Sequence, residues 1–288
     1  MYCQALCQAY KRNVPHQQQT QRPLTMAEWQ LTVIINKHSA SQPGFWVIIN
    51  HCATATVSMT STESRERAFE SAISAATLPL NGQLPRPWMT NLTDPLTAKV
   101  LIVGRNPARG YDAAMLDHAR HLDALFNRNG QSCRGLYNEL VGEPSLTRRN
   151  IDLLRTMLTH VGVDQVMETN VICYSSPMSA DLAQPAHAGG RETGTAIFRL
   201  LLEYMRPRVL IAHGAGTIRD VATIIGATLP SARSEPGAPI TVEFSGMSLI
   251  LLPSLAPPAW NRWHGWARPH LEAAAQMAAA AVESDGTQ

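Results

Sequence analysis

Polar side chains follow each of four short apolar runs in the chain, and their types and spacing favour a binding site. These residues are Asn106, Asn170, His213 and Ser254. An asparagine amide presents a hydrogen-bond donor and an acceptor together, and it can orient a water molecule although it is a poor base. Loops that follow parallel strands open at one edge of a sheet, where open α/β folds bind ligands. The alternative is a set of ordinary strand-to-helix turns, in which glycine and proline serve the backbone geometry alone.

The elements that must position these residues alternate between strand and helix. The unbroken apolar run Val100–Val103 is typical of a strand buried on both faces, and three other short runs are mostly apolar. The expected strands are Val100–Gly104, Val166–Cys173, Arg208–His213 and Met247–Leu252. The expected helices are Asp112–Asn127, Leu146–Val161, Glu192–Met205, Ala215–Ile225 and His270–Val282. This alternation predicts the α/β class, as a three-layer sandwich with a central, mostly parallel four-stranded sheet.

Turn and cap signals refine this prediction. Asp112 is expected to cap the helix after the first strand. Thr241–Phe244 is expected to pair antiparallel with the last strand through a tight turn at Ser245 and Gly246. The segment Leu78–Pro95 contains four prolines and is predicted to be a loop.

Two regions are predicted along the chain. Residues 1–60 are expected to be an N-terminal extension, in which runs 31–36 and 45–50 are typical of a small β-hairpin. Its function is unknown. Residues 61–288 are expected to form the α/β domain, beginning with a helix over Glu63–Ala76 that Thr60 or Thr62 could cap.

Composition excludes several classes of protein. The 288 residues are 45% hydrophobic and 16% charged, which is typical of a folded chain. The net charge of +2 gives no argument for nucleic-acid binding, so such a case must rest on local residues. The chain has no apolar run of the ~20 residues that a membrane helix needs, and its N-terminus lacks the apolar core of a signal peptide.

Cysteine usage indicates a reducing compartment, and we expect a cytoplasmic protein. The five cysteines are odd in number and scattered. Cys3 and Cys7 have the spacing that begins an iron–sulfur or zinc site, but no second close pair completes one. Free thiols, and no metal, are therefore expected.

Four motifs, in order along the chain, resemble the uracil-DNA glycosylase superfamily. Val103-Gly-Arg-Asn-Pro107 is similar to the first motif of the mismatch-specific and single-strand-selective branches. Glu168–Cys173 resembles the segment that bears the base-reading asparagine, and Leu252–Asn261 resembles the His-Pro-Ser loop that enters the minor groove. Ser132–Leu140 is similar to a helix of the best-known branch. The resemblance runs from about residue 99 to residue 266.

The resemblance implies a monofunctional DNA glycosylase, which hydrolyses the N-glycosidic bond of a damaged or modified pyrimidine flipped from DNA. Asn106 would position the attacking water, and Asn170 would read the Watson–Crick edge of the base or, alternatively, bond to loop backbone. Phe126 would stack on the base, or it would be a core residue. The substrate-base site is assigned to Asn170, Phe126, Gly104, Arg105, Ala108 and Tyr111.

The same loops supply the expected DNA contacts. These are assigned to Ser175, Ser254, Leu255, Arg109, Trp260 and Arg262. The serines would bind phosphate, and Leu255, Trp260 or Trp263 would be the wedge that enters the minor groove. The cations in or beside these loops are Arg105, Arg109, Arg262 and Arg268. The alternative for the tryptophans is a cluster that packs the last helix onto the sheet, above all through Trp266.

One position departs from the superfamily pattern. Leu252 stands where the best-known branch has a histidine that donates a hydrogen bond to the leaving base, and leucine has no donor. His213 is our candidate to replace it as a catalytic residue, with His264 as an alternative. A lone histidine in such a loop can also be structural. A different substrate is the other explanation, such as hydroxymethylated or glucosylated cytosine, for which Ala108 and nearby glycines leave room.

Other functional classes stay open. A catalytically inactive member of the fold would bind DNA without cleaving it. A nucleotide-binding module is the other alternative, because His213-Gly-Ala-Gly216 opens a helix, although the phosphate-binding Gly-x-x-x-x-Gly-Lys pattern is missing. We expect no cofactor, and no Schiff base, since no lysine lies in the four loops. The expected partner is single- or double-stranded DNA bound by a monomer, away from membranes, in base-excision repair or in defence against phage DNA.

Overall fold

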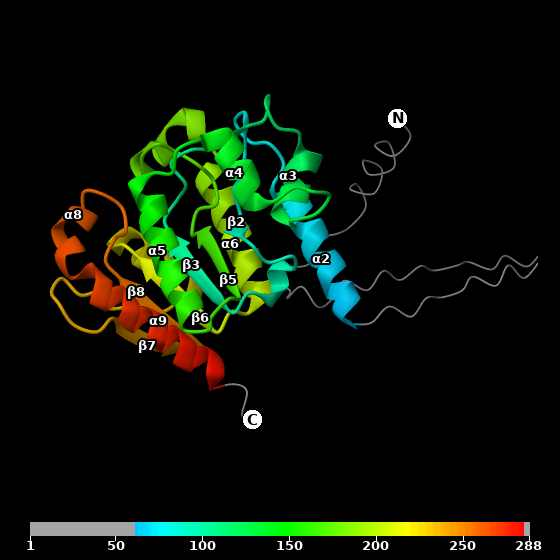
Figure 1. The fold of residues 1–288 in the computed structure, drawn as a ribbon. Helices are drawn as coiled ribbons and strands as arrows, with labels where there is room; N and C mark the ends of the chain where they lie inside the picture. Colours follow the sequence, from blue (N-terminus) through cyan, green and yellow to red (C-terminus); the bar gives the residue numbers. More distant parts are fainter. Residues whose placement is uncertain (1–60, 285–288) are drawn as a thin grey trace, which may run out of the picture. The chain divides into compact units, whose positions relative to one another are not determined.

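The computed structural model describes residues 61–284, which fold around a six-stranded sheet (Figure 1). The strand order is β2-β5-β3-β6-β8-β7. The four inner strands are parallel: β5 (Val166–Asn170), β3 (Val100–Gly104), β6 (Val209–His213) and β8 (Met247–Leu252). The two edge strands are antiparallel: β2 (Trp88–Thr90) and β7 (Ile240–Phe244). The predicted α/β class with a central, mostly parallel sheet is confirmed.

Helices cover both faces of the sheet, which makes three layers (Figure 1). One face packs against α5 (Leu146–His160) and α9 (Ala267–Glu283). The other packs against α6 (Gly190–Met205) and α7 (Ala215–Ile225), and α2 (Ser61–Ala76) contacts α6. The remaining helices are α3 (His118–Leu125), α4 (Cys133–Val141) and α8 (Trp260–Trp263), with the 3-10 turns η3 (Pro95–Thr97), η4 (Ser179–Ala183), η5 (Pro185–His187) and η6 (His264–Trp266).

Alternation along the central strand divides the hydrophobic core between these faces. Leu101 and Val103 of β3 join the cluster under α6 and α7, whereas Val100 and Ile102 join the cluster under α5 and α9. Successive side chains of a strand point to opposite faces, so both faces of β3 are dry. Polar side chains therefore have room only at the ends of the parallel strands, or where they are paired.

One buried carboxylate interrupts the apolar middle of the sheet. Glu168 of β5 is 5% exposed and forms ion pairs with Arg134 of α4 and Arg148 of α5. Arg155 of α5 lies 3.5 Å from the same carboxylate, and Asp152 bonds to both Arg134 and Arg148. This group of charges ties α4 and α5 to the sheet.

The sheet is wider than predicted because the two edge strands add to the four inner ones. Thr241–Phe244 pairs antiparallel with β8 as predicted, and the turn at Ser245 and Gly246 has φ angles of 50° and 78°. The prediction of a loop over Leu78–Pro95 is wrong at β2, where Trp88–Thr90 pairs with β5. Three residues between prolines are too short a run to be recognised as a strand from their pattern.

The predicted start of the helix over Asp112–Asn127 was also wrong. The residues at 111 and 112 form β4 (Tyr111–Asp112), which pairs with β1 (Gln83–Leu84) in a separate two-stranded sheet. Helix α3 begins at His118, and Asp117 is its cap, since its carboxylate accepts the N–H of Arg120 at 2.8 Å. Asp112 instead accepts the N–H of Ala114, two residues on, in a local turn.

Several predictions lie outside the described residues. They include the hairpin within residues 1–60, the cap at Thr60, and the thiols of Cys3, Cys7 and Cys52. The other two cysteines, Cys133 and Cys173, are free and buried, and burial raises the pKa of their thiols to about 11 and about 12. Across residues 61–284 no helix is long and apolar enough to span a membrane.

We predict that Glu168→Gln strongly destabilises the domain. The neutral amide would leave Arg134 and Arg148 without their buried counter-charge, and breaking a buried ion pair in this way costs about 3–5 kcal/mol. Urea unfolding measures the loss. The control is Glu272→Gln, which removes half of an exposed pair with Arg268. Equal stability of the two variants would contradict a structural role for the charge group.

We also predict that His121 makes the fold sensitive to acid. His121 is 0% exposed, and burial lowers its pKa from 6.5 to about 3. Between pH 6.5 and about 3 the unfolded chain therefore binds a proton at this position that the folded chain does not. The free energy of unfolding should fall as the pH is lowered through this window, by up to about 1.4 kcal/mol per pH unit. His121→Phe should reduce the slope of unfolding free energy against pH by the amount that one bound proton contributes. Urea unfolding at a series of pH values measures this slope, and the exposed residue His160 provides the control His160→Phe.

Candidate functional site

Four residues from four parallel strands form a row at the carboxyl edge of the sheet, which we call the edge row. It comprises Asn170, Gly104, His213 and Leu252. Gly104 pairs in register with Asn170, His213 pairs with Leu252, and Val103 pairs with Ala212 one step before. The residues two positions earlier in three of these strands are Ile102, Ile211 and Ile250, which pack under α5 and α9. The residues of the edge row therefore lie on the face of the sheet that α5 and α9 cover.

The missing side chain of Gly104 lets its two neighbours approach each other. A Cβ atom at this position would lie 2.7 Å from Oδ1 of Asn170 and 3.2 Å from Nε2 of His213. Glycine is the one residue that leaves this space open to both polar side chains. The structure therefore brings together Gly104, Asn170 and His213, three residues that the sequence had assigned to a site.

His213 is held neutral and without a partner. It is 6% exposed, and neither of its ring nitrogens has a hydrogen-bond partner among the described residues. Burial lowers its pKa to about 4, and the positive charge of Arg148 lowers it further in the same direction. A neutral imidazole has one N–H donor and one acceptor, so His213 can serve a ligand in both ways at neutral pH.

Asn170 is also free to bind. Its side chain is half-buried and forms no hydrogen bond with any residue in the range 61–284, although its backbone carbonyl accepts from the thiol of Cys173. The alternative, in which the Asn170 amide satisfies loop backbone, finds no support in these contacts. A free amide beside a free imidazole makes a polar patch with two donor groups and two acceptor groups.

Asn106, by contrast, is bonded to the protein. Its Nδ2 donates to the carbonyl and hydroxyl oxygens of Ser176 at 3.1 and 3.0 Å. Its Oδ1 accepts the hydroxyl proton of Ser179 at 2.5 Å. Because a carbonyl oxygen has two lone pairs, one remains open on Oδ1. Asn106 thus fixes loop 174–179 and is itself held in one orientation.

The loop after β8 turns its apolar residue inward. Leu255 is 0% exposed within the cluster under α5, and its carbonyl accepts from Nδ2 of Asn150 at 2.8 Å. The prediction of Leu255 as a DNA wedge is therefore wrong. Ser254 is half-buried, and its carbonyl accepts the indole N–H of Trp263. The tryptophan that packs most deeply is Trp263, at 4% exposed, rather than Trp266.

Burial or side-chain packing corrects three further assignments. Tyr111 is 6% exposed on β4, where the guanidinium of Arg86 covers its ring, so it contacts no base site. Ser175 is 1% exposed and donates to the carbonyl of Arg109 at 3.0 Å, so its hydroxyl is not available to a phosphate. Phe126 packs edge-on against Trp88 at 5.7 Å, which supports its alternative as a core residue.

The cations of the first loop divide between two roles. Arg105 pairs with Asp220 of α7 at 2.9 Å, so this charge is balanced inside the protein. Arg109 and Ala108 are exposed in the same loop, and Arg262 is exposed on α8 beside the half-buried Trp260. These residues remain candidates for contact with DNA.

Two residues near the site were missed by sequence analysis. Arg148 lies on α5, far along the chain from His213, and no local pattern predicts that its charge helps to lower the pKa of that histidine. Met178, in the loop that Asn106 fixes, is 67% exposed. The sequence signal that could have found it is its place directly after Ser175-Ser176-Pro177, in the loop that follows the second parallel strand.

Comparison with known proteins adds no relative: no protein-family model matches the chain, and no curated protein is similar to it. Within residues 61–284, no group of three or more His, Cys, Asp or Glu side chains is placed to hold a metal ion. The site is therefore interpreted from its own geometry.

We predict that Gly104→Ala disturbs the edge row without unfolding the protein. The new methyl group must displace the Asn170 amide, which is the end of a side chain and can move, so the stability loss should stay below about 2 kcal/mol. NMR should show shifts of the Asn170 side-chain amide and the His213 ring. Gly265→Ala is the matched control, because no atom lies within 4 Å of its Cβ position. Unchanged Asn170 and His213 signals in Gly104→Ala would contradict the close approach.

Proposed function

We propose that this protein is a DNA glycosylase on a uracil-glycosylase-like α/β fold. It would hydrolyse the N-glycosidic bond of a damaged or modified pyrimidine flipped from DNA. The observation that supports this best is the pairing of a free Asn170 amide with a neutral, unpartnered His213 over Gly104. Three of the four motifs that resemble the superfamily lie at the carboxyl ends of β3, β5 and β8, and the fourth lies on α4, which contacts β2.

Asn170 would recognise the base. An extruded pyrimidine presents a donor and an acceptor side by side on its Watson–Crick edge, and an amide matches both. Nothing else among the described residues competes for the Asn170 amide. The amide can turn over, so that its NH₂ and its carbonyl oxygen exchange places. Asn170 would therefore recognise a pyrimidine without selecting uracil over cytosine.

His213 would stabilise the departing base. Cleavage leaves negative charge on the base and positive charge on the sugar, and a donor aimed at the developing anion lowers the barrier by a few kcal/mol. Leu252 is 0% exposed and has no donor, whereas the neutral ring of His213 lies next to it in the row and retains an N–H at neutral pH. His213 would therefore supply the missing hydrogen bond.

Asn106 would orient the attacking water through the open lone pair of its Oδ1. Its bonds to Ser176 and Ser179 hold the amide in position before substrate arrives. Because an amide is a poor base, the reaction depends on a base that leaves readily. The three lysines of the chain, at positions 11, 37 and 99, lie outside the loops after β3, β5, β6 and β8, so a hydrolytic mechanism without lyase activity is favoured.

DNA would lie across the carboxyl edge. Arg109 and Arg262 are exposed there to bind phosphate, and Ser254 lies in the loop after β8. The exposed Met178 replaces Leu255 as our candidate for the wedge that fills the gap left by the flipped base. We further expect a monomer in a reducing, cytoplasmic setting.

An inactive, DNA-binding member of the fold is the second candidate. Two observations favour it: Leu252 has no donor at the superfamily's histidine position, and most of the bonding capacity of the Asn106 amide is already used within the protein. Such a protein would bind DNA through the same surface and leave the glycosidic bond intact.

We predict abasic-site formation on one member of a DNA panel. The panel holds uracil, mismatched and oxidised pyrimidines, and hydroxymethylated and glucosylated cytosine, each in single and double strands. His213→Leu should lower the rate about 10²–10³-fold, since it removes one donor to the leaving base. Asn106→Ala and Asn170→Ala should abolish measurable release.

The control is Glu272→Gln, which changes a residue 48% exposed on α9 and should cleave like the wild type. Unfolding curves of all variants separate loss of activity from loss of fold. Tight DNA binding without abasic sites on any substrate would reject the glycosylase and support the inactive member. Full activity of His213→Leu would reject the proposed donor.

A further inference from the structure

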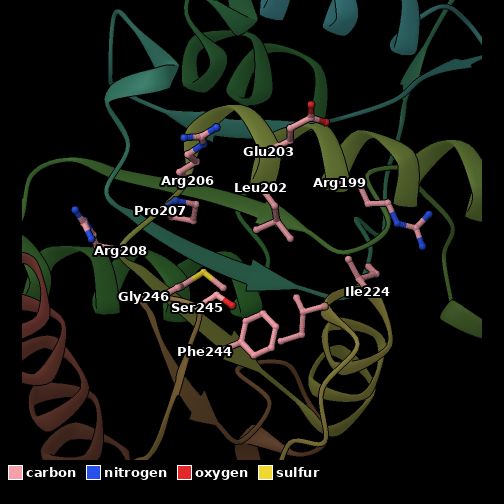
Figure 2. Close-up of a pocket in the computed structure, with 12 residues that line it drawn as sticks. Arg199, Leu202, Glu203, Arg206, Pro207, Arg208, Ile224, Phe244, Ser245 and Gly246 are labelled. Atoms are coloured by element: carbon pink, nitrogen blue, oxygen red, sulfur yellow. The ribbon is translucent and has the colours of Figure 1, made fainter. Parts of the chain in front are cut away.

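A hollow lies at the opposite edge of the sheet from the edge row, and we call it the basal pocket (Figure 2). It is bounded by the last turns of α6 and α7 and by the turn between β7 and β8. Its volume is about 630 Å³, within the range of small-molecule sites. It lies at the amino ends of β6 and β8, so the proposed glycosylase chemistry makes no use of it.

The middle of the basal pocket is apolar. Leu202, Ile224 and Phe244 gather there (Figure 2), together with Met247. All four pack against the core beneath α6 and α7 on one side and remain half-exposed on the other. An apolar or aromatic body placed here would bury the exposed sides of these residues.

The surroundings of this apolar middle are strongly positive. Arg199, Arg206 and Arg208 line the basal pocket, and Glu203 is the only acid among its lining residues. Figure 2 shows the guanidinium groups around the apolar side chains rather than among them. The side chains of Arg199 and Arg206 form no hydrogen bond or ion pair with any residue in the range 61–284. The combination of apolar centre and cationic rim complements an anion with an apolar body.

The backbone at Arg206 supports a role for its side chain. Arg206 ends α6 in the left-handed conformation, with φ 48°. The neighbouring helix α7 ends in the same conformation on Gly226, which adopts it without steric cost. Arginine is disfavoured at such a position, yet it places a cation at the mouth of the basal pocket. A glycine at position 206 would adopt this backbone conformation more readily, but it would supply no charge to the basal pocket.

We propose that the basal pocket binds a small organic anion: a carboxylate or phosphate group carried on a flat apolar body. The anion would bond to Arg206 and Arg199, and the body would lie on Phe244 and Leu202. Nothing in this proposal depends on the edge row, and its test is independent of DNA cleavage.

Three probes with one apolar body test the head group. They are 2-naphthyl phosphate, 2-naphthoate and the neutral 2-naphthalenemethanol, titrated into the full chain by calorimetry with NMR mapping. We expect one saturable site for an anion, and binding of the alcohol weaker by about tenfold or more. Tighter binding of the phosphate would identify a phosphomonoester as the ligand class, and tighter binding of the carboxylate would identify an organic acid. Equal binding of alcohol and anions would overturn the proposal.

Arg206→Gly is the decisive variant, because it removes the cation and relieves the backbone together, so it should fold at least as well as the wild type. We expect it to weaken anion binding about tenfold, to leave the alcohol unaffected, and to leave abasic-site formation unchanged. Arg206→Lys should retain most of the affinity. Arg219→Ala is the matched control elsewhere on α7 and should bind like the wild type. Undiminished anion affinity in Arg206→Gly would refute the site.

Discussion

The organisation of this protein depends on a parallel sheet that is dry on both faces. In the middle of the strands every polar side chain must be paired, as Glu168 is by Arg134 and Arg148. Unpaired polar groups such as Asn170 and His213 therefore occur where the strands end. The same constraint gives α5 a double role: it covers one face of the sheet, and the positive charge of its Arg148 adds to burial in lowering the pKa of His213.

The properties of the carboxyl edge follow from close packing there. Gly104 admits Asn170 and His213 to the same space, and burial keeps the imidazole neutral so that it retains an acceptor as well as a donor. Asn106 is fixed by two serines before any ligand arrives. A site built in this way loses little conformational freedom on binding, which supports the catalytic role that we propose for it. The basal pocket, at the other edge, is open and cationic instead.

The sequence by itself determined the architecture of the inner sheet. Short, mostly apolar runs identified all four parallel strands, and the run Val100–Val103 is unbroken because burial on both faces removes the alternation that other strands show. It also determined that Asn106, Asn170 and His213 lie in loops or strand ends at one edge, since parallel strands end together. It missed β2, whose three residues lie between prolines, and misplaced the cap of α3, because Asp112 and Asp117 carry the same local signal.

Only the tertiary structure decided which of the assigned side chains are free to act. Leu255, Tyr111 and Ser175 have the residue types and positions of contact residues, yet each is buried by partners distant in sequence. The partners are Asn150 for the loop of Leu255, Arg86 for Tyr111, and Arg109 for Ser175. Local sequence specifies backbone conformation and hydrophobicity, whereas exposure, pairing and the neutral state of His213 arise from contacts across the fold.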